Sequence, residues 1–432
     1  MTFADYDNIE FRSPSEMRRV QQNLLLEHLR YCAENSPYYG ELFAEKGVDY
    51  KRCSLEGLDE LPLTGKEELA QRNDAFLAAP PEKIVDIVFS SGTTGLPTRI
   101  VYTERDLQRL AYNERRSFGS AGVTASDIVL LTCTMDRCFV AGLAYFLGVR
   151  SLGAAAIRNG HGTREGHLEI IQRVRPTVIV GVPSFLAKLG RYLLESGVDA
   201  RATSVERLIC IGEPVRDRNL DDAPLGRVLA DLWDAEVHST YASSETVTTF
   251  CECTALQGGH LHPDLGIVEI LDDEGHAVEP GEVGEVVVTP LQVEGMPLVR
   301  FRTDDLSFLR DEPCSCGRRS PRLGPILARK KQMIKFKGTT LYPQPIAAAL
   351  EDVPGVLEHY VEVSSRDRLS DEVTVHVAVS DVSWSAERIA ERLLSRLRVK
   401  PSVVVEPIES IRDQVFSPRY RKPMRFVDRR SS

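Results

Sequence analysis

The stretch Phe89-Ser90-Ser91-Gly92-Thr93-Thr94-Gly95-Leu96-Pro97-Thr98 follows an apolar run, Ile84–Phe89, in the first quarter of the chain. The apolar run predicts a buried strand, and the loop after it then leaves the edge of a sheet. Two glycines let backbone N–H groups approach phosphate oxygens without a Cβ in the way, and the hydroxyls of Ser90, Ser91, Thr93 and Thr94 offer further donors. The stretch therefore predicts a binding site for a polyphosphate.

Two other interpretations of this loop have less support. A Walker A loop requires G-x-x-x-x-G-K-[ST], which does not occur in the chain. A Ser/Thr/Gly-rich surface turn would explain an arbitrary Gly-Thr-Thr-Gly, but the ordered string S-S-G-T-T-G-x-P after a strand is much more specific. Phosphate binding therefore remains the prediction.

Composition limits the class of protein. With 432 residues, 42% of them hydrophobic and 27% charged, the chain is expected to be a soluble globular protein with one large and one small domain. Its net charge of −10 argues against a general nucleic-acid-binding protein, because no excess of Lys and Arg is available to bind phosphates. The sequence shows neither a long apolar run nor a secretory signal, so we expect no membrane span and a cytoplasmic location.

Past the predicted phosphate loop, strand-like runs alternate with amphipathic, helix-like stretches. The expected strands cover residues 128–132, 154–157, 178–182, 208–211 and 237–241, and the expected helices include 165–173 and 184–194. Such alternation predicts an α/β fold with a mostly parallel sheet covered by helices. Ligands of these sheets bind beyond the carboxyl ends of the strands, which is where the motifs described below fall.

Three other regions have patterns of their own. Near the start, Ser13-Pro14-Ser15-Glu16 is a capping-box sequence that predicts the beginning of a helix. Short strands at 268–271, 285–289 and 298–301 predict a β-rich subdomain. A small α+β domain is predicted from strands at 334–336, 359–363, 373–379 and 402–405 and helices at 343–350 and 386–397.

The phosphate-loop string resembles that of the adenylate-forming superfamily, which includes acyl-CoA and aryl-CoA ligases, luciferases and adenylation domains. Many members have Lys after the Pro, whereas this chain has Thr98-Arg99, which is similar to the phenylacetate-CoA ligase branch. The resemblance implies an ATP-binding role for Ser90, Ser91, Gly92, Thr93, Thr94 and Gly95.

Two further motifs resemble the family's nucleotide site. Ile211-Gly212-Glu213-Pro214 resembles G-A-E-P, which borders the adenine and implies roles for Gly212, Glu213 and Pro214. Tyr241-Ala242-Ser243-Ser244-Glu245 is similar to Y-G-x-[ST]-E, where Tyr241 would stack on adenine, Ala242, Ser243 and Ser244 would border the phosphates, and Glu245 would hold Mg²⁺. The alternative for S-S-E is a helix N-cap.

Three more matches follow in the family's order. Phe301-Arg302-Thr303-Asp304-Asp305 resembles Y-R-T-G-D, so Asp305 would accept hydrogen bonds from both ribose hydroxyls, with a surface acidic pair as the alternative. Arg329-Lys330-Lys331-Gln332-Met333 resembles the hinge, which implies that Arg329 contacts ATP and that Lys331 is the pivot; a charged helix face is the alternative. Arg421–Arg430 resembles the closing motif and aligns Lys422 with the catalytic lysine, although it could be a basic tail.

The resemblance implies three parts: an adenylation domain at 1–328, a hinge at 329–333 and a small mobile α+β lid at 334–432. The first part would carry the ATP, acid and zinc sites. The expected reaction is ATP-dependent conversion of an acid, aryl or arylacetic by resemblance, to acyl-AMP and its transfer to CoA. A homodimer is expected by resemblance only.

The chain has close cysteine pairs at Cys251-Glu252-Cys253 and Cys314-Ser315-Cys316. With His260 or His262, they could supply four tetrahedral ligands to a structural Zn²⁺ ion. Some phenylacetate-ligase-like proteins have such a site, and their Cys and His match Cys253 and His260 best, with Cys251 or His262 as substitutes. Reduced, unliganded cysteines are the alternative, and we expect the scattered Cys32, Cys53, Cys133, Cys138 and Cys210 to be core residues.

The acid pocket is the least defined part of the prediction. It would draw on 133–142, with Arg137 and Phe139, and on the turn Val182-Pro183-Ser184-Phe185. Lys66 belongs to a segment that resembles P-x-T-x-K-x-x-L and could face the active site, or it could be a solvated lysine. Transfer to a carrier protein, an amine or another cofactor, a non-catalytic nucleotide-binding relative, and a metal-binding interaction protein remain alternatives.

Overall fold

The computed structural model describes residues 3–90, 98–160, 162–336, 339–351, 353–365, 371–381, 383–416 and 423–430. The chain divides into two compact units, Met1–Ile326 and Leu327–Ser432. Ser91–Gly95 of the predicted phosphate loop and the predicted catalytic Lys422 lie outside the described residues. Among the helices that are described, none has the length and apolar character needed to cross a membrane.

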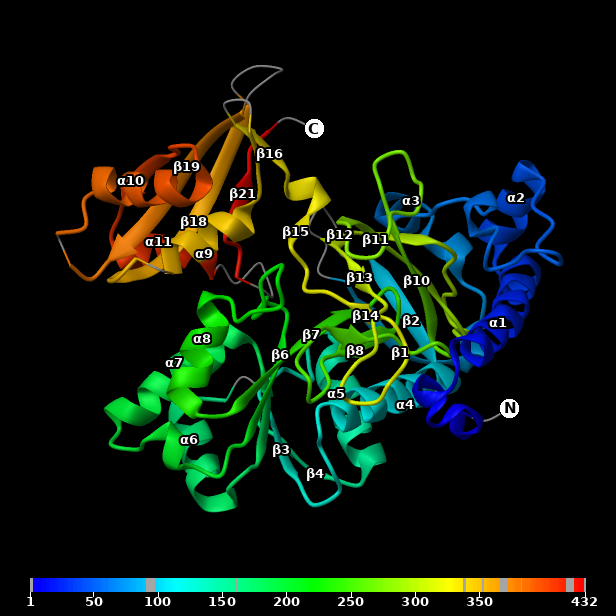
Figure 1. Ribbon diagram of the computed structural model, residues 1–432, viewed down its shortest axis with the longest axis horizontal. Coiled ribbons are helices and arrows are strands. Elements are labelled where there is room, and N and C mark those ends of the chain that lie inside the picture. Colours follow the sequence, from blue (N-terminus) through cyan, green and yellow to red (C-terminus); the bar gives the residue numbers. More distant parts are fainter. Residues whose placement is uncertain are drawn as a thin grey trace. The chain divides into compact units, whose positions relative to one another are not determined.

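A six-stranded sheet forms the centre of the first unit (Figure 1). In spatial order its strands are β4 (Ala155–Arg158), β3 (Ile128–Leu131), β5 (Val178–Gly181), β6 (Arg207–Ile211), β7 (Glu236–Ser243) and β8 (Thr248–Cys251). Neighbours from β4 to β7 are parallel, and β8 runs antiparallel to β7. The predicted α/β fold with a mostly parallel sheet is confirmed, and each predicted strand of this region overlaps an observed one.

Helices cover both faces of this sheet because successive side chains of each strand point to opposite faces. Leu130, Ile179 and Leu208 join the apolar cluster formed with one group of helices. This group is α6 (Arg164–Val174), α7 (Pro183–Glu195) and α8 (Pro224–Trp233). Val129 and Val180 point the other way, into a cluster with α4 (Glu104–Ser120) and α5 (Val140–Leu152) (Figure 1).

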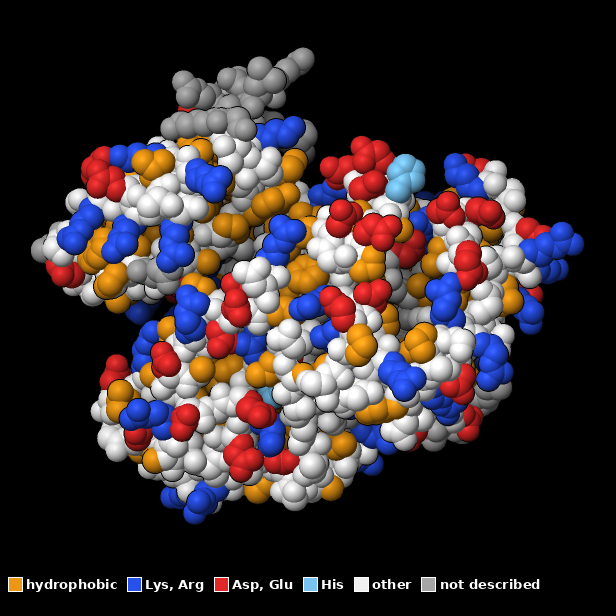
Figure 2. Space-filling model, viewed as in Figure 1, with side chains coloured by type: hydrophobic (Ala, Val, Ile, Leu, Met, Phe, Trp, Pro, Cys, Tyr) orange, Lys and Arg blue, Asp and Glu red, His pale blue; other side chains and the backbone are white. Residues whose placement is uncertain are grey.

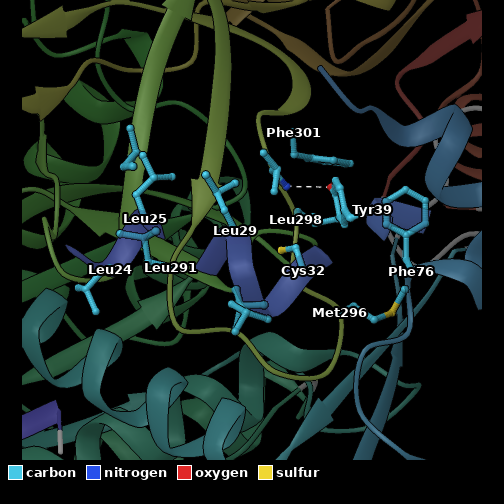
Figure 3. Packing of buried hydrophobic residues seen from close by; sticks show 14 of the residues in the cluster. Leu24, Leu25, Leu29, Cys32, Tyr39, Phe76, Leu291, Met296, Leu298 and Phe301 are labelled. Atoms are coloured by element: carbon cyan, nitrogen blue, oxygen red, sulfur yellow. Dashed lines mark hydrogen bonds between the residues drawn. The ribbon is translucent and has the colours of Figure 1, made fainter. Parts of the chain in front are cut away.

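The N-terminal segment is helical and packs on a long loop of the same unit. The predicted capping box at Ser13 and Glu16 is confirmed and starts α1 (Pro14–Asn35), which α2 (Pro37–Lys46) follows. Figure 3 shows Leu25 and Leu29 facing Leu291 and Leu298, and the Val299 N–H donates to the Tyr39 hydroxyl at 2.8 Å. Burial of these side chains fixes the loop that leads into the next strand.

The predicted β-rich region contains the antiparallel strands β10 (Gly266–Leu271), β11 (Gly284–Pro290) and β12 (Phe301–Ser307). Figure 2 shows acidic side chains and a histidine gathered at the turn between β10 and β11. The predicted strand at 298–301 was wrong, because β12 only begins at Phe301. Arg300 before it has a φ of 43°, which is incompatible with a strand. A smaller sheet joins β9 (Gly259–His260), β13 (Leu309–Arg310) and β14 (Arg322–Leu323).

The strand before the phosphate loop differs from the prediction in its burial. Among the described residues, β1 (Ile84–Phe89) pairs only with the antiparallel β2 (Arg99–Thr103), in a two-stranded sheet. Val85, Ile87 and Phe89 are 53%, 48% and 38% exposed, so the strand is correct but its predicted burial is wrong. An apolar run does not reveal how many layers cover a sheet.

The remaining elements are short helices and the second unit. α3 spans Lys66–Gln71, and 3-10 helices span Phe3–Tyr6, Ile9–Phe11, Leu58–Glu60, Asn73–Phe76, Pro81–Lys83, Ala200–Ala202 and Lys330–Gln332. The second unit contains β15 (Ala328–Arg329), β16 (Ile334–Phe336), β17 (Thr339–Leu341), α9 (Pro343–Glu351), β18 (Val356–Ser365), β19 (Asp371–Val379), α10 (Ala386–Leu397), β20 (Ser402–Val405), α11 (Ile408–Val415) and β21 (Phe426–Asp428). Its four-stranded sheet has the order β20-β19-β18-β21. Here the sequence analysis missed β15, β17, α11 and β21.

Candidate nucleotide site and metal centre

The two motifs predicted to border the nucleotide lie at the carboxyl ends of neighbouring parallel strands. Gly212 follows β6 directly and has a φ of 78°, a conformation that glycine adopts without strain. The second motif was expected after its strand, but β7 extends through Ser243 because that residue pairs with Thr248 of β8. A turn and then β8 follow Glu245, so the helix-cap alternative for S-S-E does not apply.

Tyr241 and Asp305 meet although they lie 64 residues apart, one on β7 and the other on β12. The Tyr241 hydroxyl donates a hydrogen bond of 3.0 Å to Asp305 Oδ2. Burial, together with the nearby Asp305 carboxylate, raises the pKa of Tyr241, so the phenol remains a protonated donor near neutral pH. The structure thus brings a predicted adenine-stacking ring and a predicted ribose acceptor into contact.

Glu245 offers an oxygen ligand beside this pair. Its Oε2 accepts a hydrogen bond of 2.8 Å from Ser243 Oγ, and its Oε1 makes no hydrogen bond to the described residues. Hard cations such as Mg²⁺ prefer carboxylate oxygens of this kind. The donor chemistry therefore fits the predicted metal.

Glu213 links the predicted nucleotide motif to the predicted acid pocket. Its carboxylate accepts hydrogen bonds from the Ser184 backbone N–H at 2.9 Å and from Ser184 Oγ at 3.0 Å. Ser184 lies in the first turn of α7, where free backbone N–H groups attract an acid. The sequence analysis named both residues but did not connect them.

Lys66 contacts the strand that carries Asp305. Its ammonium donates to the Thr303 carbonyl and lies 3.4 Å from Asp304 Oδ2. Asp304 has a φ of 63°, and its N–H donates to Glu285 Oε1 at 3.3 Å. A non-glycine residue in this left-handed conformation is thus held from two sides, directly before Asp305.

The loop predicted for the acid pocket lies next to the end of β1. Arg137 and Cys138 have φ values of 57° and 53°, and Phe139 precedes α5. The Phe89 N–H donates to the Cys138 carbonyl at 3.0 Å, and the N–H of the buried Ser90 donates to the Thr98 carbonyl at 2.9 Å.

Cys138 is exposed, so its assignment to the core was wrong, whereas Cys32, Cys53, Cys133 and Cys210 are buried.

The second unit contains the residues predicted for the hinge. Arg329 lies in β15, and Lys331 lies in the 3-10 helix Lys330–Gln332 that follows. Their roles toward ATP and toward domain movement remain predictions.

Cys253, His260, Cys314 and Cys316 converge, and their ligand atoms all lie within 4.8 Å of one another. His260 Nε2 is 3.3 Å from Cys316 Sγ, and the Sγ atoms of Cys253 and Cys314 are 3.6 Å apart. His260 Nδ1 lies 3.2 Å from the Ser320 carbonyl, an arrangement that fixes the tautomer with Nε2 free to bind a metal. Burial lowers the pKa of His260 to about 4, so the imidazole is neutral near neutral pH.

The two substitute ligands lie outside this cluster. Cys251 Sγ accepts a hydrogen bond of 3.3 Å from Thr240 Oγ1. His262 Nδ1 lies 2.7 Å from Glu10 Oε1. Three thiols and one imidazole in a largely buried cluster suit a tetrahedral Zn²⁺ ion with no open position.

Comparisons with known proteins identify the family of the chain. A family model described as AMP-binding enzyme matches residues 38–293, and one described as AMP-binding enzyme C-terminal domain matches 338–430. Phenylacetate-coenzyme A ligase from Thermus thermophilus is 33% identical over 372 residues, 85% of this chain and 82% of that protein. The Escherichia coli protein of that name is 28% identical over 89% of this chain and 87% of its own length.

Solved structures support the fold. A 2-hydroxyisobutyryl-CoA ligase in the postadenylation state, in complex with 2-HIB-AMP, has a TM-score of 0.82 and 21% sequence identity. The match covers 99% of this chain and 90% of that one. At this identity, the likeness establishes the arrangement of the chain and not the substrate.

Proposed function

The chain belongs to the AMP-binding enzymes, the family that includes the phenylacetate-coenzyme A ligases, and we propose that it acts on an aryl or arylacetic acid. It is an AMP-forming acid–CoA ligase, which activates a carboxylic acid with ATP and transfers the acyl group to CoA. The substrate class is inferred from the relatives named phenylacetate-coenzyme A ligase.

The two-step reaction solves a leaving-group problem. A thiol cannot displace oxide from a carboxylate, so a carboxylate oxygen first attacks the α-phosphorus of ATP and pyrophosphate leaves. The CoA thiolate then attacks the carbonyl carbon of the acyl-AMP, and AMP leaves with the electron pair of the broken C–O bond. Each step needs precise positioning and stabilisation of negative charge more than covalent help from the protein.

The proposed roles come from the family motifs and, for Tyr241, Glu245 and Asp305, are supported by the hydrogen bonds described above. Tyr241 stacks on adenine, Asp305 accepts hydrogen bonds from the ribose hydroxyls, and Ser90–Gly95 contact the phosphates. Glu245 would hold Mg²⁺, which neutralises charge on the triphosphate when it is bound. Lys422 would place the carboxylate in line with the α-phosphorus, Arg329 would contact ATP, and Lys331 would be the pivot that lets the second unit serve both steps.

The hydrogen bond between Tyr241 and Asp305 is the single observation that supports this assignment most strongly. It unites two motifs that a surface turn or an isolated acidic pair would not bring together. The test is pyrophosphate release with ATP and Mg²⁺ across aryl, arylacetic and fatty acids, each with and without CoA. We expect release with one acid class and a CoA thioester; release without a thioester would indicate another acceptor.

Two matched variants test the assignment of the nucleotide site. Tyr241→Phe keeps the stacking ring and removes the bond to Asp305, so we expect a modest loss of ATP affinity, corresponding to about 1 kcal/mol. Asp305→Asn loses an acceptor for a vicinal diol and should weaken ATP much more. The ribose assignment predicts that 2′,3′-dideoxy-ATP, which lacks both hydroxyls, binds equally well to Asp305→Asn and to the wild type, whereas ATP binds more weakly to the variant. Equal binding of ATP to the two proteins would reject the assignment.

A separate test addresses Lys422. Lys422→Ala should slow adenylation but leave thioester formation from supplied acyl-AMP largely intact. An equal loss in both half-reactions would contradict the role. Arg421→Ala is the matched control, because it removes the neighbouring positive charge.

We also propose that Cys253, His260, Cys314 and Cys316 bind one structural Zn²⁺ ion. Elemental analysis of purified protein should give one zinc per chain, and none for Cys316→Ser.

Reduced thiols of this kind fit a reducing compartment such as the cytoplasm. A homodimer is the proposed assembly, and light scattering after size-exclusion chromatography tests it.

A further inference from the structure

A strained residue lies directly beyond the predicted magnesium ligand. Val247, two positions after Glu245, has a φ of 52° and is only 2% exposed. This left-handed conformation is a clear outlier for a β-branched side chain. Surrounding structure must therefore hold it in place.

Arg109 of α4 supplies the contact on one side. This side chain is completely buried, and its guanidinium donates to the carbonyls of Val247, Leu265 and Leu291, the last at 2.7 Å. It also donates to Thr248 Oγ1 at 3.3 Å. All four acceptors are neutral groups, and they come from three separate segments of the chain.

Tyr102 of β2 supplies the contact on the other side. It is completely buried, and its hydroxyl donates to the Ser244 carbonyl at 3.0 Å. The turn Ser244–Val247, which carries Glu245, is therefore fixed at its first carbonyl by Tyr102 and at its last by Arg109. Neither residue belongs to a motif that the sequence analysis singled out.

We propose that Arg109 and Tyr102 are positioning residues that hold Glu245 in its metal-binding position by clamping the backbone on either side of it. The inference rests on the proposed function, because Glu245 must be the metal ligand. Neither side chain would touch the substrate or the metal.

The arrangement of donors explains why arginine is needed. A planar guanidinium directs several N–H groups along fixed directions, whereas a lysine ammonium is a compact charge that cannot reach the same set of carbonyls. Burial lowers the pKa of Arg109 to about 10, so the side chain still carries its proton and its full set of donors near neutral pH. Arg109→Lys should therefore keep the charge but release the Val247 carbonyl.

The first experiment measures binding of Mn²⁺, as a probe for the magnesium site, in the presence of ATP. Arg109→Lys should weaken Mn²⁺ binding about tenfold, as expected when support of a ligating carboxylate is lost. Arg116→Lys is the matched control, since it is a buried arginine on the same helix with different partners. Circular dichroism and thermal unfolding establish that both variants are folded.

The second experiment is a rescue. Val247→Gly removes the cost of the left-handed conformation, so adding it to Arg109→Lys should restore most of the Mn²⁺ affinity. Tyr102→Phe should weaken Mn²⁺ binding by a smaller factor of about 3, because it removes one neutral hydrogen bond. Thioester formation from supplied acyl-AMP and CoA needs no triphosphate. Its rate should therefore change less than about twofold in all variants, which is the size of effect expected for a substitution away from the reacting groups.

The outcomes separate this inference from the proposed function. Wild-type protein without ATP-dependent Mn²⁺ binding would refute the proposed function. Wild-type binding that Arg109→Lys leaves unchanged would refute only the positioning role. Equal weakening in Arg109→Lys and Arg116→Lys, without rescue by Val247→Gly, would assign Arg109 to general stability and overturn the inference.

Discussion

The N-terminal half of α4 buries Arg109 (the Arg109 end) and its C-terminal half buries Arg116 (the Arg116 end). The first arginine has neutral partners, whereas the second has carboxylates. Arg109 donates to backbone carbonyls and one hydroxyl. Seven residues further along, Arg116 lies 2.5 Å from Asp264 Oδ1 and 2.9 Å from Glu10 Oε1. Burial lowers the pKa of Arg109, whereas Asp264 and Glu10 raise the pKa of Arg116 against the effect of burial.

The difference indicates what each charge does. The Arg116 end joins the N-terminal segment to the cysteine–histidine cluster, because Glu10 also contacts Arg318 and accepts a backbone hydrogen bond from Arg319, close to Cys316. The Arg109 end fixes the turn that carries Glu245. We infer that the paired arginine serves stability and the arginine without a bonded carboxylate serves the geometry of the site.

Breaking the ion pairs of Arg116 should have the largest effect on stability. Arg116→Met leaves the buried Asp264 without its arginine and leaves Glu10 with the more distant Arg318 as its arginine partner, so the free energy of unfolding should fall by about 3–5 kcal/mol. Urea unfolding monitored through Trp233 measures this loss of stability in a Trp384→Phe background. The background variant is needed because the chain has these two tryptophans and only Trp233 lies in the first unit. A loss under about 1 kcal/mol would place this pair with ordinary surface ion pairs.

Removing the proposed zinc should destabilise the Arg116 end of α4. It should leave metal binding at the Arg109 end unchanged. At free zinc 100-fold above its dissociation constant, chelation should cost the first unit about 2.7 kcal/mol. ATP-dependent Mn²⁺ binding at the Arg109 end should change less than about twofold, the scale of a change away from the site. Cys316→Ser should reproduce the loss, and Cys138→Ser, at an exposed cysteine outside the cluster, is the control.

Glu114 is another buried ionisable residue of α4 and lies between the two arginines. It accepts a hydrogen bond of 2.5 Å from Thr249 Oγ1, and burial raises its pKa from 4.5 to about 8. The folded state therefore binds this proton more tightly than the unfolded state, so its contribution to stability falls as pH rises from about 4.5 to about 8.

Glu114→Gln remains neutral at every pH. Its unfolding free energy, relative to wild type, should increase by about 2 kcal/mol between pH 5.5 and pH 7, from 1.36 kcal/mol per pH unit. Urea titrations at three pH values measure the difference. A constant difference would mean that the carboxyl is already ionised in the folded protein.

The smallest effect is expected for a partly exposed arginine on the same helix. Arg115 pairs with Asp7, and its side chain is 30% exposed. Arg115→Ala should lower the free energy of unfolding by under about 1 kcal/mol, and the loss should shrink further in high salt. A loss as large as that of Arg116→Met would show that burial of the partner carboxylates is not the deciding factor.

Much of the fold followed from patterns among consecutive residues. The strands at 178–182 and 208–211 and helix 386–397 were predictable because apolar periodicity is a local property. The capping box at Ser13 was predictable because its partners are three residues apart. The start of β12 was not, because a left-handed Arg300 and the bond to Tyr39 depend on distant packing.

The sequence by itself determined the family, the order of its motifs and the residue types of the cysteine–histidine cluster, because short strings of neighbouring residues carry each of them. Only the tertiary structure decided that Cys253 and His260, rather than Cys251 and His262, join Cys314 and Cys316. It also decided that Tyr241 meets Asp305 and that Arg109 holds the Val247 carbonyl. These pairings span 64 and 138 residues, and strand register and helix packing, which no local pattern encodes, set which side chains meet.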